Sequence, residues 1–327
     1  MIHTWKKYKL SEIGSVVGGA TPSTTVDAYY NGDIPWLTPK DLSNFHERYI
    51  ERGERNITKS GLNSCSAQLL PAGSVLFSSR APIGYVAIAK NPIATNQGFK
   101  SIIPNPEKVD SLFLYYLLKY NKDNIEAMGS GTTFKEVSGA TMKNIEVYLP
   151  EDLEEQRRIA GILESLDDKI ELNRRINANL EAQAQALFRS WFVDFEPFRD
   201  GPFVDSELGK IPQGWKVGAA SEFYKNITIG KTPPRKEHQW FSKESHDIVW
   251  VSIADMGNCG LSICNSSEYL TPEAIKKFNI CIVPVNTVLL SFKLTIGRVA
   301  IADKELATNE AIAHFQTQHN TLEYTYL

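Results

Sequence analysis

The sequence VAIAKNPIATNQGF, residues 86–99, is nearly repeated as VAIADKELATNEAI, residues 299–312. Asn96 and Asn309 occupy the same place in the two segments and lie 213 residues apart (309 − 96). A long internal repeat governs the interpretation of a whole chain, because each copy is a candidate folding unit. The repeat therefore indicates two related domains.

The repeat extends well beyond these two segments. With the same offset, Pro71 matches Pro284, Val75 matches Val288, Ser78 matches Ser291, and Ile83-Gly84 matches Ile296-Gly297. Further upstream the offset drifts by a few residues: Trp5 matches Trp215, residues 19–22 match 230–233, and residues 34–38 match 248–252. Loop insertions explain the drift, whereas chance does not hold one register over such a length.

Each copy consists of short apolar segments separated by Gly and Pro, such as GSVLFSS at 73–79, and in the first copy the helical segment SLFLYYLLKY follows at 111–120. These patterns predict an α+β (mixed α/β) fold with two repeated domains related by pseudo-symmetry. Trp36 and Trp250 lie inside strand-like segments and are expected in the cores. Asn96 is expected to stabilise a turn, because Asn side chains bond to nearby backbone groups.

A different pattern separates the two copies. Residues 151–198 contain eleven Asp and Glu but six Lys and Arg, and no Gly or Pro follows Gly161 until Pro197. Heptad spacing predicts a helix over 153–195, about 40 residues and roughly 60 Å long. Its stripe consists of Ile159, Ile162, Leu166, Ile170, Asn173, Ile176, Leu180 and Leu187. Such a stripe needs a packing partner, and Asn173 would fix the register of that coiled-coil-type contact.

The length of 327 residues also agrees with two domains, because one hydrophobic core rarely serves so long a chain. The expected organisation is a first domain at 1–150, the helix at 151–198, a linker at 199–211 and a second domain at 212–327. The second domain is expected to be incomplete, because the counterpart of Pro150 would fall near position 363 (150 + 213). Truncation, or a helix supplied by another chain, would account for the missing part.

The composition is that of a folded protein, with 42% hydrophobic and 22% charged residues. No apolar segment is long enough to cross a bilayer and the N-terminus lacks the apolar stretch of a signal peptide, so a cytoplasmic location is expected. The four Cys residues have no CxxC spacing, which argues against a zinc site or disulfides and favours buried thiols. The net charge of −3 argues mildly against a nucleic-acid binder that acts alone.

The sequence contains no familiar catalytic motif. It has no GxxxxGK[ST] phosphate loop, no GxGxxG, no GxSxG and no HExxH, and no Cys/His or Ser/His/Asp set recurs in both copies. Neither an enzymatic activity nor a cofactor or metal is therefore expected of this chain.

The candidate functional residues lie in loops. Arg80 has a counterpart in Lys293 at the shared offset, and a long basic side chain in a turn can reach a phosphate or a guanine. A solvated surface charge is the alternative interpretation. The Gly-rich segment GSGTTFKEVS at 129–138 suits backbone and base contacts, but such segments also make ordinary turns.

Taken together, these segments resemble the specificity subunit of a type I restriction-modification system, over nearly the whole chain. The recognition-domain pattern comprises GGATP at 18–22, IPWLTPKDL at 34–42, SSRAPIGYVAIA at 78–89, ATNQGF at 94–99 and GSGTTFKEVSGATMKNIEVYLP at 129–150. The segment LPEDLEEQRRIAGILESLDDKIELNRRINANLEAQAQALFRSWF at 149–192 resembles the central conserved region of that family. The ordered set is far more specific than any single motif.

The resemblance implies that each domain reads one half of a split double-stranded DNA site and that the helix spaces the two domains. Catalysis would belong to methyltransferase subunits and an endonuclease-translocase subunit docked on the conserved part. The residues expected to contact DNA are Lys40, Arg80, Thr132, Thr133, Lys135, Lys231 and Lys293.

Two other classes remain open: a fragment of a fused restriction-methylation enzyme, and a duplicated interaction module that does not bind DNA. The isolated chain is expected either to self-associate through the central helix, because the stripe has no second such helix to pack against in this sequence, or to have a poorly ordered second domain.

Overall fold

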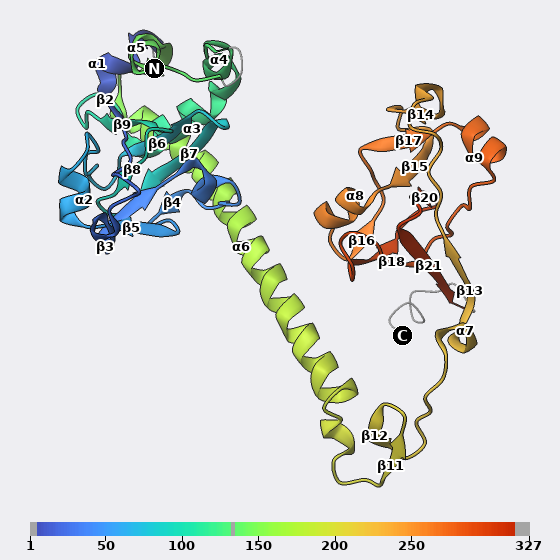
Figure 1. Ribbon diagram of the computed structural model, residues 1–327. Coiled ribbons are helices and arrows are strands. Elements are labelled where there is room, and N and C mark those ends of the chain that lie inside the picture. Colours follow the sequence, from blue (N-terminus) through green and yellow to red (C-terminus); the bar gives the residue numbers. More distant parts are fainter. Residues whose placement is uncertain (1–4, 132–134, 318–327) are drawn as a thin grey trace. The chain divides into compact units, whose positions relative to one another are not determined.

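A computed structural model of the protein describes residues 5–131 and 135–317 (Figure 1). The chain divides into two compact units, residues 1–188 and 189–327. Each unit has its own sheets and its own hydrophobic clusters. Among the described residues, no helix is long and apolar enough to cross a membrane.

The first unit is built on a five-stranded and a three-stranded sheet. The larger sheet has the order β2 (Gly14–Gly18), β9 (Lys100–Pro104), β6 (Val75–Ser79), β7 (Ile83–Ala89) and β4 (Tyr49–Ile50). Its strands are antiparallel except for the parallel pair of β4 and β7. The smaller sheet has the order β5 (Arg55–Ile57), β3 (Tyr30–Leu37) and β8 (Ala94–Thr95), and a separate ribbon pairs β1 (Trp5–Lys9) with β10 (Glu146–Pro150).

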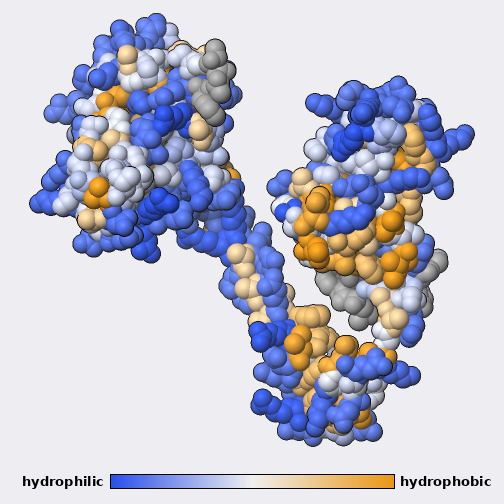
Figure 2. All heavy atoms as spheres, in the orientation of Figure 1, coloured by the Kyte–Doolittle hydropathy of each residue, from blue (hydrophilic) through white to orange (hydrophobic). Residues whose placement is uncertain are grey.

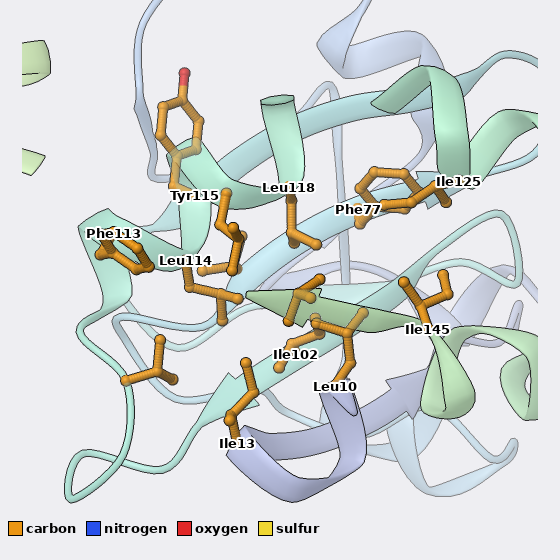
Figure 3. Close-up of a cluster of buried hydrophobic side chains, with 14 of the residues drawn as sticks. Leu10, Ile13, Phe77, Ile102, Phe113, Leu114, Tyr115, Leu118, Ile125 and Ile145 are labelled. Atoms are coloured by element: carbon orange, nitrogen blue, oxygen red, sulfur yellow. The ribbon is translucent and has the colours of Figure 1, made fainter. Parts of the chain in front are cut away.

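Short helices flank these strands: α1 (Leu10–Ile13), η1 (Asp27–Tyr29), η2 (Pro39–Leu42), α2 (Lys59–Asn63), α3 (Ser111–Tyr120), α4 (Lys122–Ala127) and α5 (Gly139–Asn144). The predicted helical segment is α3, and Asp110 caps it by accepting hydrogen bonds from two backbone N–H groups of the first turn, at 2.9 and 3.0 Å. Leu114 and Leu118 on its apolar face belong to the same buried cluster as Phe77 and Ile102 of the sheet (Figure 3).

The second unit repeats this plan. Its five-stranded sheet has the order β13 (Tyr224–Ile229), β21 (Ile312–Thr317), β18 (Val288–Ser291), β19 (Val299–Ala302) and β16 (Ser262–Ile263). Its smaller sheet has the order β14 (Phe241–Ser242), β17 (Glu268–Leu270), β15 (Ile248–Val251) and β20 (Ala307–Thr308). The helices are η3 (Glu196–Phe198), α7 (Ala220–Phe223), η4 (His238–Trp240), α8 (Ile253–Asn258) and α9 (Pro272–Phe278), and β11 (Phe203–Ser206) and β12 (Gly209–Pro212) form a hairpin.

Corresponding strands confirm the repeated domains. The order β2, β9, β6, β7, β4 in the first unit is matched by β13, β21, β18, β19, β16 in the second. The registers also agree: Trp36 lies opposite Ala94 in a parallel pair, as Trp250 lies opposite Ala307. Both tryptophans are buried, with exposed fractions of 4% and 1%, as the sequence predicts.

The predicted long helix is α6, Leu153–Phe192, with 40 residues. Its first turns pack on the first unit, where Gln156 and Ala160 are buried and Ile159 contacts the hydrophobic cluster. The other stripe residues are exposed in the described structure, namely Ile162, Leu166, Ile170, Asn173, Ile176, Leu180 and Leu187. Figure 2 shows tan patches along the otherwise blue surface of the helix. The helix thus has an anchored start and a long apolar stripe open to solvent.

The expectation of buried thiols is wrong. The four free cysteines, Cys65, Cys259, Cys264 and Cys281, are all partly exposed. None of them lies in a strand or a helix, so none takes one of the inward-facing positions that the regular elements provide.

Candidate nucleic-acid interface

Three of the repeated motifs meet at one place in each unit. The backbone N–H of Ala20 donates to the carbonyl of Thr95 at 3.0 Å, and the indole N–H of Trp36 donates to the carbonyl of Ala20 at 3.0 Å. In the second unit Lys231 takes the place of Ala20, with a backbone bond of 2.9 Å to Thr308 and an indole bond of 3.2 Å from Trp250. The GGATP, IPWLT and ATN motifs therefore form one structural junction, repeated in both units.

Glycine is required at this junction. A Cβ atom on Gly19 would lie 2.1 Å from the carbonyl oxygen of Asn96, and one on Gly230 would lie 2.2 Å from that of Asn309. Both distances are far shorter than any real contact, so the two backbones approach as closely as only glycine permits.

The Asn residues of the ATN motif are structural, as expected. The side-chain oxygen of Asn96 accepts a hydrogen bond from the N–H of Gly98 at 2.9 Å, and that of Asn309 accepts one from Ala311 at 3.1 Å. Each Asn therefore closes its own tight turn, and this turn supports the neighbouring basic one.

The turns that carry Arg80 and Lys293, residues 79–84 and 292–297, lie against the turns closed by Asn96 and Asn309. Backbone hydrogen bonds run from Ser79 to Gly98 at 2.7 Å and from Phe292 to Ala311 at 3.0 Å. The third residue of each turn has a positive φ, 48° at Ala81 and 61° at Leu294, although neither is glycine. The two turns therefore share an unusual φ at the same position but carry different side chains, and the first turn also contains a cis Ala81–Pro82 peptide bond where the second has Leu294–Thr295.

In the first unit Arg80 lies in a cluster of three charges. Its guanidinium is 3.6 Å from the Glu136 carboxylate, and the Lys100 ammonium is 3.2 Å from the same carboxylate. Two cations thus share one anion, which leaves a net positive charge. Because Arg80 and Glu136 are both partly exposed, their ion pair is weak enough to open in favour of a phosphate.

The Gly-rich segment is attached to this cluster. Ser130 and Glu136 exchange backbone hydrogen bonds of 3.0 and 2.9 Å, and Val137 donates to the carbonyl of Ser79 at 2.9 Å. Lys135 is exposed beside this ladder, whereas Thr132 and Thr133 lie outside the described residues. Arg80 and Lys135, far apart in sequence, therefore belong to one surface.

The second unit presents different charges at the corresponding corner. Lys293 is exposed, with its ammonium 5.5 Å from the centre of the Phe292 ring. The Thr232 hydroxyl donates to Glu310, and this hydrogen bond, aided by the positive charges of Lys293 and Arg235, lowers the pKa of the Glu310 carboxyl. An ionised carboxylate therefore lies near Lys293.

The equivalent hydrogen bond in the first unit involves no charged side chain. The Thr21 hydroxyl bonds to the side-chain oxygen of Gln97, which occupies the position of Glu310. Sequence reasoning did not single out Gln97 or Glu310, nor the neighbouring Lys100. The signal for the first two was present, because they are the one unlike pair within the otherwise identical ATN[QE] motif.

The remaining two lysines have other partners. Lys40 lies in η2 with its ammonium 3.0 Å from the Glu54 carboxylate, and both side chains are exposed. Lys231 donates to the carbonyl of Phe278 at 2.8 Å, where it satisfies the C-terminal end of α9. Lys40 is thus available to a ligand at little cost, whereas Lys231 already has a structural role.

No group of three or more His, Cys, Asp or Glu side chains among the described residues is arranged to hold a metal ion.

Comparisons with known proteins agree on one family. Residues 2–182 and 212–327 match the family described as type I restriction modification DNA specificity domain. The specificity subunit of the type I restriction enzyme MjaIX from Methanocaldococcus jannaschii is 44% identical over 278 residues, which cover 84% of this chain. The chain spans only 62% of the length of that relative.

A second relative, the specificity subunit of the type I restriction enzyme HindI from Haemophilus influenzae, is 24% identical, over 99% of this chain and 82% of its own length. Among solved structures, an S subunit of a type I restriction-modification system from M. genitalium matches with a TM-score of 0.49 and 14% identity, over 99% of this chain and 77% of that one.

Proposed function

We propose, because the chain belongs to the type I restriction modification DNA specificity family, that it is the DNA-recognition component of a type I restriction-modification complex. Residues 1–150 and 212–327 are the two target-recognition domains in this proposal, and each reads one half of a bipartite double-stranded DNA site. Residues 151–198 space the two domains, and residues 199–211 link the helix to the second one. The chain itself is non-catalytic, and methyltransferase and endonuclease-translocase subunits supply the chemistry.

The observation that carries this proposal is that the two units have equivalent turns, at Arg80 and at Lys293, with different side chains. The turns at Arg80 and Lys293 share a positive φ at the third residue and the same support from an Asn turn. Their side chains differ, with Arg80 partly exposed and Lys293 exposed, and so do Gln97 and Glu310 beside them. A constant scaffold with variable exposed groups is what reading two different half-sites requires, because base edges are distinguished by the donors and acceptors that face them.

The central helix suits protein contacts better than DNA contacts. The segment 151–198 carries eleven acidic and six basic residues, so it would repel phosphates. Its exposed stripe, from Ile162 to Leu187, is the surface that a second helix would cover. We propose that this helix comes from a docked subunit or, in the isolated chain, from a second copy of α6.

The proposal is tested by co-expressing the chain with methyltransferase subunits and mapping every methylated base in the host genome. The expected result is one bipartite sequence with a fixed spacer. A matched sample in which the chain is omitted controls for other methyltransferases.

Three outcomes would count against the proposal. A continuous methylated sequence would contradict the assignment of one half-site to each domain. Stable binding of the chain to methyltransferase subunits without any sequence preference would favour an interaction module that does not read DNA. Methylation by the chain alone would indicate a catalytic protein.

A further inference from the structure

Arg48 is the most deeply buried arginine among the described residues, and it lies outside every motif discussed above. It precedes β4, and its side chain is only 7% exposed. Burying a guanidinium is costly unless other groups bond to it and balance its charge. Its surroundings therefore indicate what it is for.

All three carboxylates around Arg48 come from α6. One guanidinium nitrogen donates to the Asp168 carboxylate, and another donates to the backbone carbonyl of Glu164 at 3.1 Å and lies 3.8 Å from its carboxylate. The third nitrogen, Nε, is 3.6 Å from the Glu171 carboxylate, which is too long for a hydrogen bond. The arginine thus bridges two turns of the helix.

Other polar contacts surround this cluster. Tyr116 of α3 donates to Asp167 at 3.0 Å, and Arg175 pairs with Glu47 at 3.0 Å. Burial by itself would lower the pKa of Arg48, but hydrogen bonds with Tyr116 and Asp168 and the charge of Glu171 raise it above its ordinary value. The guanidinium therefore remains charged in its buried position.

The geometry of α6 relates these contacts to its apolar stripe. Each residue rotates an α-helix by about 100°, so Glu164, Asp168 and Glu171 share one face of the helix. By the same count, Leu166, Asn173 and Leu180 lie on the opposite face. When the acidic face lies against Arg48, the stripe is turned away from the first unit, which agrees with its exposure.

The described part of the second unit has no such arginine. The backbone carbonyl of Arg48 accepts a hydrogen bond from Ile88 at 2.8 Å, and the carbonyl of Leu261 accepts one from Ile301, the counterpart of Ile88, at 2.9 Å. Leu261 therefore occupies the position of Arg48, and it is 65% exposed. The acidic face of α6 is complementary to the first domain and not to the second.

We propose that Arg48 is the positioning residue that fixes the rotation and direction of α6 on the first recognition domain. Buried ion pairs are weak evidence for stability, and their best-attested role is to select one register over others. Here the selected rotation of α6 turns the stripe away from the first domain, where a partner helix can pack on it. The consequence for DNA, which rests on the function proposed above, is that Arg48 helps to hold the half-site spacing at one value.

The first experiment is hydrogen exchange on the full chain. Arg48→Leu, which installs the residue of the second copy, should speed amide exchange in residues 161–175 by about 10-fold or more, because the helix loses its buried anchor. Exchange in β6 and β7 should stay unchanged. Arg48→Lys keeps the charge and should recover part of the protection. The control Arg175→Ala removes an exposed pair and should alter exchange by less than about 3-fold.

The second experiment is methylated-site mapping of the Arg48→Leu complex. The half-site sequences should remain, while at least two spacer lengths appear in place of one. If Arg48→Leu does not fold, the triple variant Glu164→Gln, Asp168→Asn, Glu171→Gln makes the same test from the helix surface, without touching the first domain.

Unchanged exchange in residues 161–175 of a folded Arg48→Leu chain would overturn the proposal, and so would faster exchange with a single, unaltered spacer. Failure of the proposed function can be distinguished from failure of this proposal. In that case the unsubstituted chain would yield no bipartite site, whereas hydrogen exchange would still report whether Arg48 anchors α6.

Discussion

Among the described residues, the two copies of the recognition fold differ on the face that carries Arg48 in the first and Leu261 in the second. In the first unit α3 and α4 pack on β7, and Ile83 is only 5% exposed. Its counterpart Ile296 is 77% exposed in the second unit, and Leu261 is 65% exposed. Figure 2 shows orange side chains gathered over the β16 and β18 part of that unit. The sheets are thus alike in the two units, and among the described residues α3 and α4 cover this face in the first unit while Ile296 and Leu261 stay exposed in the second.

The interiors also differ at a buried polar position. Ser101 and His314 are counterparts at the shared offset and are both fully buried. The two ring nitrogens of His314 lie 3.0 Å from the Thr228 hydroxyl and 2.7 Å from the Thr308 hydroxyl. Burial lowers the pKa of His314 from 6.5 to about 4. The second unit therefore contains a buried neutral imidazole where the first has a hydroxyl.

The largest expected effect tests what the copies share. Gly19→Ala and Gly230→Ala should each destabilise the unit that carries it by about 3 kcal/mol or more, because the new methyl would overlap a backbone oxygen. Chemical denaturation followed by unit-resolved hydrogen exchange measures this. Gly161→Ala is the control, because its methyl would meet nothing within 4 Å, and it should stabilise α6 by about 0.5–1 kcal/mol. A loss below 1 kcal/mol at either junction would show that the close approach is not essential.

The next effect separates the copies by pH. Because the folded pKa of His314 is below its unfolded value, the unfolded chain binds the extra proton first as the pH falls. The second unit should lose about 3 kcal/mol between pH 6.5 and pH 4 through this group alone. His314→Gln should remove that part of the pH dependence, and the first unit should not respond to the substitution. Identical pH profiles for His314→Gln and the unsubstituted chain would refute the buried neutral imidazole.

The basic turns should give intermediate effects on DNA binding. In the assembled complex, Arg80→Ala should weaken binding by about 1–3 kcal/mol or relax the first half-site, and Lys293→Ala should do the same for the second. Binding at several salt concentrations and methylated-site mapping distinguish a base contact from a phosphate contact. A folded Arg80→Ala complex with unchanged DNA affinity and unchanged methylated sites would contradict the prediction. Arg80 would then be only a surface charge paired with Glu136.

The smallest effect concerns Lys40, whose counterpart is Ala254. Lys40→Ala should change folding stability by less than about 0.5 kcal/mol, because both partners of its ion pair with Glu54 are exposed to solvent. If Lys40 contacts a phosphate, Lys40→Ala should weaken binding equally for all DNA sequences. The number of counterions released on binding, measured from the salt dependence, should then fall by about one. A stability loss above 1 kcal/mol would assign Lys40 to the scaffold instead.

Sequence alone predicts the parts of this fold that depend on local patterns. The repeat gave the duplicated domains, heptad spacing gave α6, and strand-like surroundings placed Trp36 and Trp250 in the cores. In each case the pattern itself is the physical cause, because apolar spacing determines which face of an element is buried.

The rest depends on contacts between distant segments. Glu164, Asp168 and Glu171 have the pattern of a solvated helix face, and no local feature links them to Arg48, more than 100 residues earlier. Lys231 is similar, since only the folded chain shows that it caps α9. The repeat is least informative where the copies diverge, and the candidate DNA contacts lie there.

The central claim is that one scaffold presents two different reading turns, and an exchange of turns tests it most directly. Residues 292–297 (FKLTIG) would be replaced by the sequence of residues 79–84 (SRAPIG), which has the same length and also a positive φ at the third residue. Arg298 is left in place because it donates to the carbonyl of Ile253 at 2.6 Å and so supports α8. Methylated-site mapping of the exchanged complex should show an altered second half-site, an unaltered first half-site and an unchanged spacer. A folded complex with both half-sites unaltered would contradict the claim, because these turns would then not read DNA.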